Sequence, residues 1–198
     1  MAGRRLAACT FSVRVHSVIK SKGVSLVRRL FLFLVAASAT AGLCSPVLAG
    51  ELFGGVYVHD VKLPTDKSGI ENGADIQLGY RFGKIGPTPL QPYIFGALNT
   101  AGQTSYAAVG ISAKFGSLIY VRPGLGLAIH NGSTADFFRP DKIAFGSRVL
   151  FEPELAIGAR INNRLSIEAS WVHMSHAQLF SHENPGIDNL GVRVNLAL

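Results

Sequence analysis

Apolar and polar residues alternate along most of the chain beyond residue 50. The alternation is clearest at 74–83, where Ile76, Leu78, Tyr80 and Phe82 alternate with Asp75, Gln77, Gly79 and Arg81. Successive side chains of a β-strand point to opposite faces, so this period of two predicts strands with one apolar and one polar face. The pattern recurs between turn residues and predicts strands at 51–59, 74–83, 91–99, 105–115, 119–129 and 148–161, with two more in the hairpin 163–198. No stretch has a convincing helical period.

The even number of strands predicts a closed sheet. Eight antiparallel strands close a small barrel without leaving a sheet edge. We therefore expect an all-β fold, an eight-stranded antiparallel outer-membrane β-barrel that forms one domain over 50–198. A soluble sandwich or lipocalin would show the same alternation with its apolar face turned inward. The membrane barrel is favoured because its polar face carries charges of both signs, which suits a filled polar interior. These residues are Arg81, Arg122, Arg160, Arg193, Glu152, Glu154 and Glu168.

The segment 1–49 has the features of a secretory signal peptide. A basic region is followed by the apolar run LFLFLVAASATAGLC, which is shorter than the roughly 20 residues that a membrane-spanning helix needs. The small-residue pattern Val47-Leu48-Ala49 then predicts cleavage after Ala49. The alternative is a buried or anchoring helix, and the true start of translation could lie downstream of Met1. Both cysteines precede the expected cleavage site, so the mature chain has no cysteine chemistry.

The net charge of +7 comes from this leader. Seven of the 19 basic residues and none of the 12 acidic residues lie in 1–49, which leaves 12 of each sign in the rest of the chain. The mature chain is therefore formally neutral, and its charge gives no reason to expect a nucleic-acid partner. The sequence leaves the oligomeric state open, a homodimer included.

Candidate chemistry lies in the C-terminal hairpin. His173 and Ser175 have the parity of the apolar residues at the end of one expected strand, and Asp188 has the parity of Leu190 at the start of the next. A serine attacks an ester when a base removes its proton, and a carboxylate can orient that base. In an even-stranded barrel with both ends of the chain in the periplasm, this cluster lies near the outer-leaflet boundary, within reach of lipid acyl chains. The alternative is that these polar residues simply lie at headgroup level.

The same residues resemble a known family. HMSHA at 173–177, followed by NPGID at 184–188, is similar to the C-terminal signature of the outer-membrane lipid A 3-O-deacylases. The resemblance implies an eight-stranded barrel in which Ser175 is the nucleophile, His173 the base and Asp188 the acidic member. That family more usually has Asn in place of His176 and Glu in place of Asp188. Glu183 in the intervening loop is the rival acid.

The resemblance and the position of the site predict a serine esterase that removes an ester-linked acyl chain, the 3-O chain by resemblance, from lipid A in the Gram-negative outer membrane. Asn184 and the Gly186 amide are the candidate oxyanion donors. Arg139 and Lys142 are candidate contacts for lipid A phosphates. No cofactor or metal is expected.

Two other functions stay open. The first is a structural or adhesive barrel without catalysis, in which the hairpin only completes the fold. The second is an acyltransferase barrel, which would hold its reacting groups and the acyl chain inside. The outward parity of Ser175 argues against this second alternative. No role is assigned to His176 or His182.

Overall fold

The computed structural model describes residues 50–63, 69–135, 142–179 and 185–198. The expected signal peptide at 1–49 lies outside these residues. The strands are β1 (Glu51–Val58), β2 (Ala74–Arg81), β3 (Leu90–Asn99), β4 (Tyr106–Ala113), β5 (Phe115–Gly116), β6 (Ile119–His130), β7 (Val149–Arg160), β8 (Leu165–Met174) and β9 (Ile187–Ala197). Each expected strand is present, with its ends shifted by a few residues at most.

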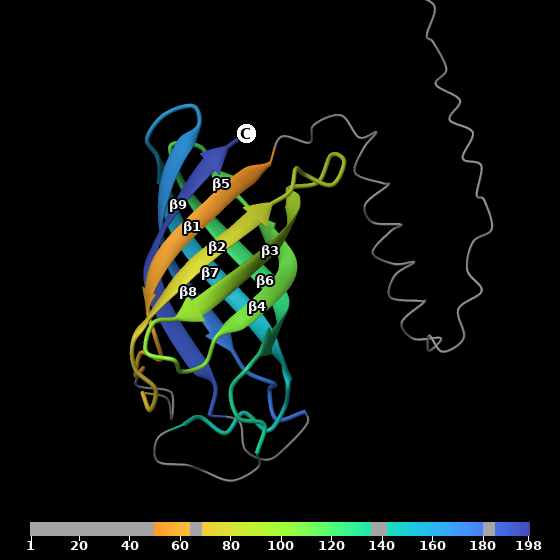
Figure 1. Ribbon diagram of the computed structural model, residues 1–198. Coiled ribbons are helices and arrows are strands. Elements are labelled where there is room, and N and C mark those ends of the chain that lie inside the picture. The colour runs from red at the N-terminus through yellow and green to blue at the C-terminus, as the bar shows by residue number, and fades with distance from the viewer. Residues whose placement is uncertain (1–49, 64–68, 136–141, 180–184) are drawn as a thin grey trace, which may run out of the picture. The chain divides into compact units, whose positions relative to one another are not determined.

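The strands form one closed antiparallel barrel (Figure 1). They follow one another in the order β4-β3-β2-β1-β9-β8-β7-β6, and the pairing of β4 with β6 closes the ring. The two-residue β5 continues the line of β4 beyond Lys114 and pairs with β6 at Tyr120 and Val121. The barrel therefore has the eight strands that the sequence predicts, one of them interrupted at Lys114.

The connections at the two ends of the barrel differ. We call the end with the connections 59–73, 100–105, 131–148 and 175–186 the loop end, and the end with the connections 82–89, 117–118 and 161–164 the turn end. The C-terminus lies at the turn end (Figure 1). Because β8 runs toward the loop end and β9 returns from it, the candidate residues at 173–175 and 188 lie at the loop end.

The outward face of the barrel is apolar. Exposed and buried residues alternate along β6, and outward side chains such as Leu98, Ile119 and Leu78 are 70%, 69% and 63% exposed. A closed ladder that pairs its backbone groups and presents such a wall is suited to hydrocarbon surroundings. No helix in the described part of the chain is long and apolar enough to cross a membrane.

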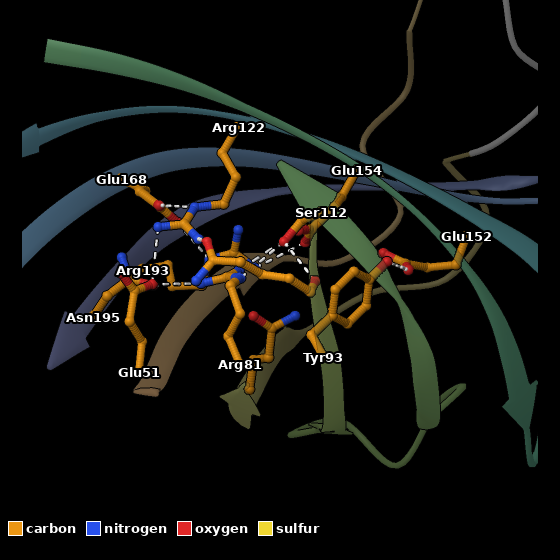
Figure 2. A network of polar contacts seen from close by, with 12 residues as sticks. Glu51, Arg81, Tyr93, Ser112, Arg122, Glu152, Glu154, Glu168, Arg193 and Asn195 are labelled. Carbon is orange, nitrogen blue, oxygen red and sulfur yellow. Dashed lines mark hydrogen bonds and ion pairs between the residues drawn. The ribbon is translucent and has the colours of Figure 1, made fainter. Parts of the chain in front are cut away.

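Ion pairs fill the interior (Figure 2). Arg193 donates from Nε to Glu168 at 2.8 Å and from Nη1 to Glu154 at 2.9 Å. Arg122 donates from Nε to Glu168 at 2.9 Å and from Nη2 to Glu51 at 2.9 Å. Buried charges are tolerated when opposite charges and hydrogen bonds compensate them, so each of these guanidinium groups lies between two carboxylates. The interior is thus a packed polar core, as the mixed charges of the inward face predict.

Arg160 departs from this expectation. Its parity is inward, but it is the last residue of β7 and its side chain is exposed. It lines a hollow at the turn end together with Asn162 and Arg164. Arg81, which is fully buried, donates instead to Glu51 at 3.0 Å. At the end of a strand the barrel opens to water, so parity alone does not decide whether a long cation is enclosed.

A second polar cluster ties the loop end together. Just beyond β1, the buried His59 donates from Nδ1 to Asp75 at 3.0 Å and from Nε2 to Glu71 at 3.1 Å. The Glu71 carboxylate also accepts hydrogen bonds from the Thr104 amide at 2.9 Å and the Ile143 amide at 3.2 Å. One imidazole and one carboxylate therefore connect three of the four connections at the loop end.

This cluster predicts a pH-dependent stability. Burial by itself lowers the pKa of His59, but the hydrogen bonds to Asp75 and Glu71 outweigh it and raise the pKa to about 9. A folded-state pKa above the unfolded value stabilises the protein fully below about pH 6.5, and this stabilisation is lost as the pH rises through about 9. We expect the loss to be on the order of 3 kcal/mol in urea unfolding of the barrel in detergent.

The matched variant is His59→Gln, which keeps a polar side chain but does not titrate. It should be less stable than the wild type at pH 6 and show a smaller decrease in stability between pH 6 and pH 10. Equal pH dependence in the two proteins would contradict the role given to His59.

Candidate active site

The pairing of β8 with β9 brings two of the expected site residues together. His173 and Asp188 are direct partners across the two strands, with their side chains on the same side of the sheet. The His173 Nδ1 lies 3.0 Å from the Asp188 Oδ1. In the tautomer that donates from Nδ1, the lone pair is on Nε2, which is the form that a general base requires.

Asp188 is more enclosed than its parity suggests. Its position corresponds to the outward face, yet its side chain is only 2% exposed, against 23% for His173. The Trp171 indole is hydrogen-bonded to the carboxylate: its Nε1 donates to the same Oδ1 at 2.6 Å. We did not expect this contact from the sequence, although the spacing of Trp171, His173 and Asp188 on one face was the signal that could have indicated it.

Ser175 follows His173 by two residues. Just beyond β8, its backbone forms an isolated antiparallel bridge with Phe151 of β7. The Ser175 amide donates to the Phe151 carbonyl at 3.1 Å, and the Ser175 carbonyl accepts from the Phe151 amide at 2.7 Å. Its side chain is partly exposed. Among the described residues no hydrogen bond joins the Ser175 hydroxyl to the His173 ring. Catalytic hydrogen bonds often form only when substrate is bound, so this geometry is compatible with a reactive serine.

Gly186 lies against the His173 ring. Its φ of +69° is in the left-handed region that favours glycine. A methyl group on its Cα would lie 3.0 Å from the His173 Cε1 and 3.5 Å from Nε2. Gly186 therefore borders the ring along its Cε1–Nε2 edge. Asn184, the other expected oxyanion donor, lies outside the described residues.

A tight turn follows Ser175. Ala177 and Gln178 have φ values of 51° and 59°, and the Leu179 amide donates to the His176 carbonyl at 2.9 Å. Two successive non-glycine residues in the left-handed region cost about 1–2 kcal/mol each. Such strain is found more often at functional sites than elsewhere, so this turn adds to the reasons for placing the site here.

Of the remaining expected residues, the rival acid Glu183 lies outside the described part of the chain. Lys142 is exposed in the connection 131–148, whereas Arg139 in the same connection and His182 lie outside the described residues. His176 is buried, as its parity predicts. In the described ranges no group of three or more His, Cys, Asp and Glu side chains is arranged to hold a metal ion.

These observations define a membrane-spanning β-barrel with a histidine–carboxylate pair on its outer wall. The family described as lipid A 3-O-deacylase (PagL) matches residues 95–197, which is more than half of the chain. The protein belongs to this family, and it is an outer-membrane protein of a Gram-negative bacterium. No curated protein matches the sequence.

Solved structures show the same fold. The crystal structure of the outer membrane enzyme PagL is 18% identical over 75% of this chain and 99% of its own, with a TM-score of 0.52. Neisserial surface protein A (NspA) is 11% identical over 75% of this chain and 97% of its own, with a TM-score of 0.50. A de novo designed transmembrane β-barrel is 8% identical over 78% of this chain and 98% of its own, with a TM-score of 0.50. At these identities the likeness concerns the fold alone.

Proposed function

We propose that the protein is a serine esterase that hydrolyses the 3-O-linked acyl chain of lipid A. Membership of the deacylase family supports the substrate. The observation that carries the catalytic assignment is the His173–Asp188 pair, 3.0 Å apart on the outer wall with Ser175 two residues further on. Ser175 is the nucleophile, His173 the general base and Asp188 the carboxylate that orients it.

The reaction proceeds in two steps. The Ser175 Oγ attacks the acyl carbonyl carbon while the His173 Nε2 takes the hydroxyl proton, which gives a tetrahedral oxyanion. Its collapse breaks the bond to the sugar oxygen, which leaves with the proton from His173 as the free 3-hydroxyl. Water, activated by His173, then attacks the acyl-serine ester and releases the fatty acid. Asp188 stabilises the imidazolium that forms in each step.

The oxyanion requires donors about 3 Å from the developing charge. We assign this role to the Gly186 amide and the Asn184 side chain. Gly186 supports the assignment because it already borders His173 on the side of Nε2. The lack of a Cβ there also leaves room for the ester beside the ring.

The filled interior argues against the acyltransferase alternative. Fully buried Arg81, Arg122 and Arg193 occupy the inside of the barrel together with their carboxylate partners. An acyl chain in the lumen would have to displace this ion-pair network, whereas the outer wall is apolar and already faces lipid.

The phosphates of lipid A are assigned to Arg139 and Lys142. The support is the exposure of Lys142 in the connection 131–148 at the loop end, where headgroups lie. Cations there would bind anionic groups above the membrane surface.

Replacing Ser175 by alanine tests the esterase. We expect at least about a thousandfold loss of activity, because the nucleophile is removed while folding is unaffected. Mass spectrometry of lipid A from cells that express the wild type should show the loss of one hydroxyacyl chain, and cells that express Ser175→Ala should retain it. Ser117→Ala, an exposed serine at the turn end, is the matched control and should behave as the wild type.

Two results would contradict the proposal. If lipid A is unchanged with the wild type folded in the membrane, the structural or adhesive alternative takes its place. If Ser175→Ala deacylates lipid A like the wild type, the nucleophile lies elsewhere.

Replacing Gly186 by alanine should lower the deacylation rate about tenfold to a hundredfold, since the methyl group would crowd His173 and strain the backbone. The measurement is fatty acid release from lipid A in detergent micelles, with folding checked by heat-modified migration on gels. Gly102→Ala, which also has a positive φ but no atom within 4 Å of the added methyl group, controls for backbone strain. Equal losses in the two variants would remove the specific role of Gly186.

Reversing the charges at Arg139 and Lys142 together should raise the KM for bisphosphorylated lipid A several-fold and leave dephosphorylated lipid A less affected. Lys84→Glu at the turn end is the control. An unchanged KM for the phosphorylated substrate would exclude the assignment.

A further inference from the structure

The Asp188 carboxylate has two nitrogen donors from β8. Trp171 and His173 occupy successive outward positions of the strand, and both direct a ring nitrogen to the same oxygen, Oδ1, at 2.6 Å and 3.0 Å. Their ring centroids are 5.9 Å apart with planes tilted by 30°. One oxygen of Asp188 therefore lies within hydrogen-bond distance of both the indole and the imidazole.

The indole N–H of Trp171 donates to a carboxylate of the protein itself. Tryptophan at an interface ordinarily presents its N–H to headgroups and water. Here the N–H donates to the Asp188 carboxylate, whose side chain is 2% exposed. Water can therefore hardly reach this carboxylate as a hydrogen-bond donor. Hydrogen bonds to charged groups are among the stronger ones in proteins, so the loss of the Trp171 N–H would weaken the hold on this carboxylate.

We propose that Trp171 is a positioning residue for the esterase, acting through Asp188. Its N–H fixes the carboxylate so that Oδ1 faces the His173 Nδ1, which keeps the imidazole in the tautomer with its lone pair on Nε2. Trp171 does not contact the reacting atoms. The inference rests on the proposed function of Ser175, His173 and Asp188.

The test is a double-mutant cycle with Trp171→Phe and Asp188→Asn. Phenylalanine keeps an aromatic ring at the position but lacks the N–H. We expect Trp171→Phe to lower kcat for lipid A in detergent micelles about tenfold, with KM unchanged, because the hydrogen bond serves the chemical step rather than substrate binding. In the Asp188→Asn background the same replacement should cause little further loss, since residues that act through one group are not additive.

Ile167→Ala is the matched control on β8, because Ile167 also faces outward, is 41% exposed and pairs with Val194 far from Asp188. It should retain the kcat of the wild type. An unchanged kcat in Trp171→Phe, a change confined to KM, or full additivity with Asp188→Asn would each overturn the inference while leaving the esterase intact. An inactive wild type, or an active Ser175→Ala, would instead overturn the proposed function.

Discussion

Pairing of every backbone polar group is the constraint on which the rest of this structure depends. In hydrocarbon an unpaired amide or carbonyl costs several kcal/mol, so the sheet must close, and the pairing of β4 with β6 closes it. Once the ladder is closed, each residue has a fixed side. The inward positions are then filled by side chains, among them Arg193, Glu154 and Glu168, which form ion pairs with one another. The outward positions are left for contact with lipid.

The residues that stabilise the barrel interior and the residues of the candidate active site therefore lie on opposite faces of the sheet. The interior charges compensate one another and are enclosed, so they are poorly placed to bind an acyl chain. The candidate site is on the other face, where His173 and Asp188 are joined by the register of β8 and β9. A shift of one residue in that register would turn one of them inward and separate the pair. The His59 cluster at the loop end contributes indirectly, because it ties together the connections beside the site.

Much of this could be predicted from the alternation of residues. A period of two identifies the strands and their faces, and it placed His173, Ser175 and Asp188 on one side of the hairpin. Alternation could not predict that Asp188 is enclosed, since that depends on the rotamer of Trp171 and its indole hydrogen bond. It also assigned Arg160 to the interior, because parity takes no account of where a strand passes out of the barrel. The contacts of Glu71 join segments far apart in sequence and have no local signal.

The end of a strand at the edge of a membrane suits an esterase of the proposed kind for a physical reason. A carboxylate on a wall that faces lipid is costly unless donors surround it, and Trp171 and His173 provide two of them. The side chains become more accessible from Asp188 on β9, at 2%, to its partner His173 on β8, at 23%, and then to the partly exposed Ser175 that follows β8. In the proposed mechanism the orienting acid is thereby enclosed while the nucleophile stays open to the substrate. Beyond Met174 the chain leaves the regular ladder, and the connection that follows contains Gly186, whose amide is our candidate oxyanion donor. The same groups in the middle of β8 would have their amides committed to neighbouring strands.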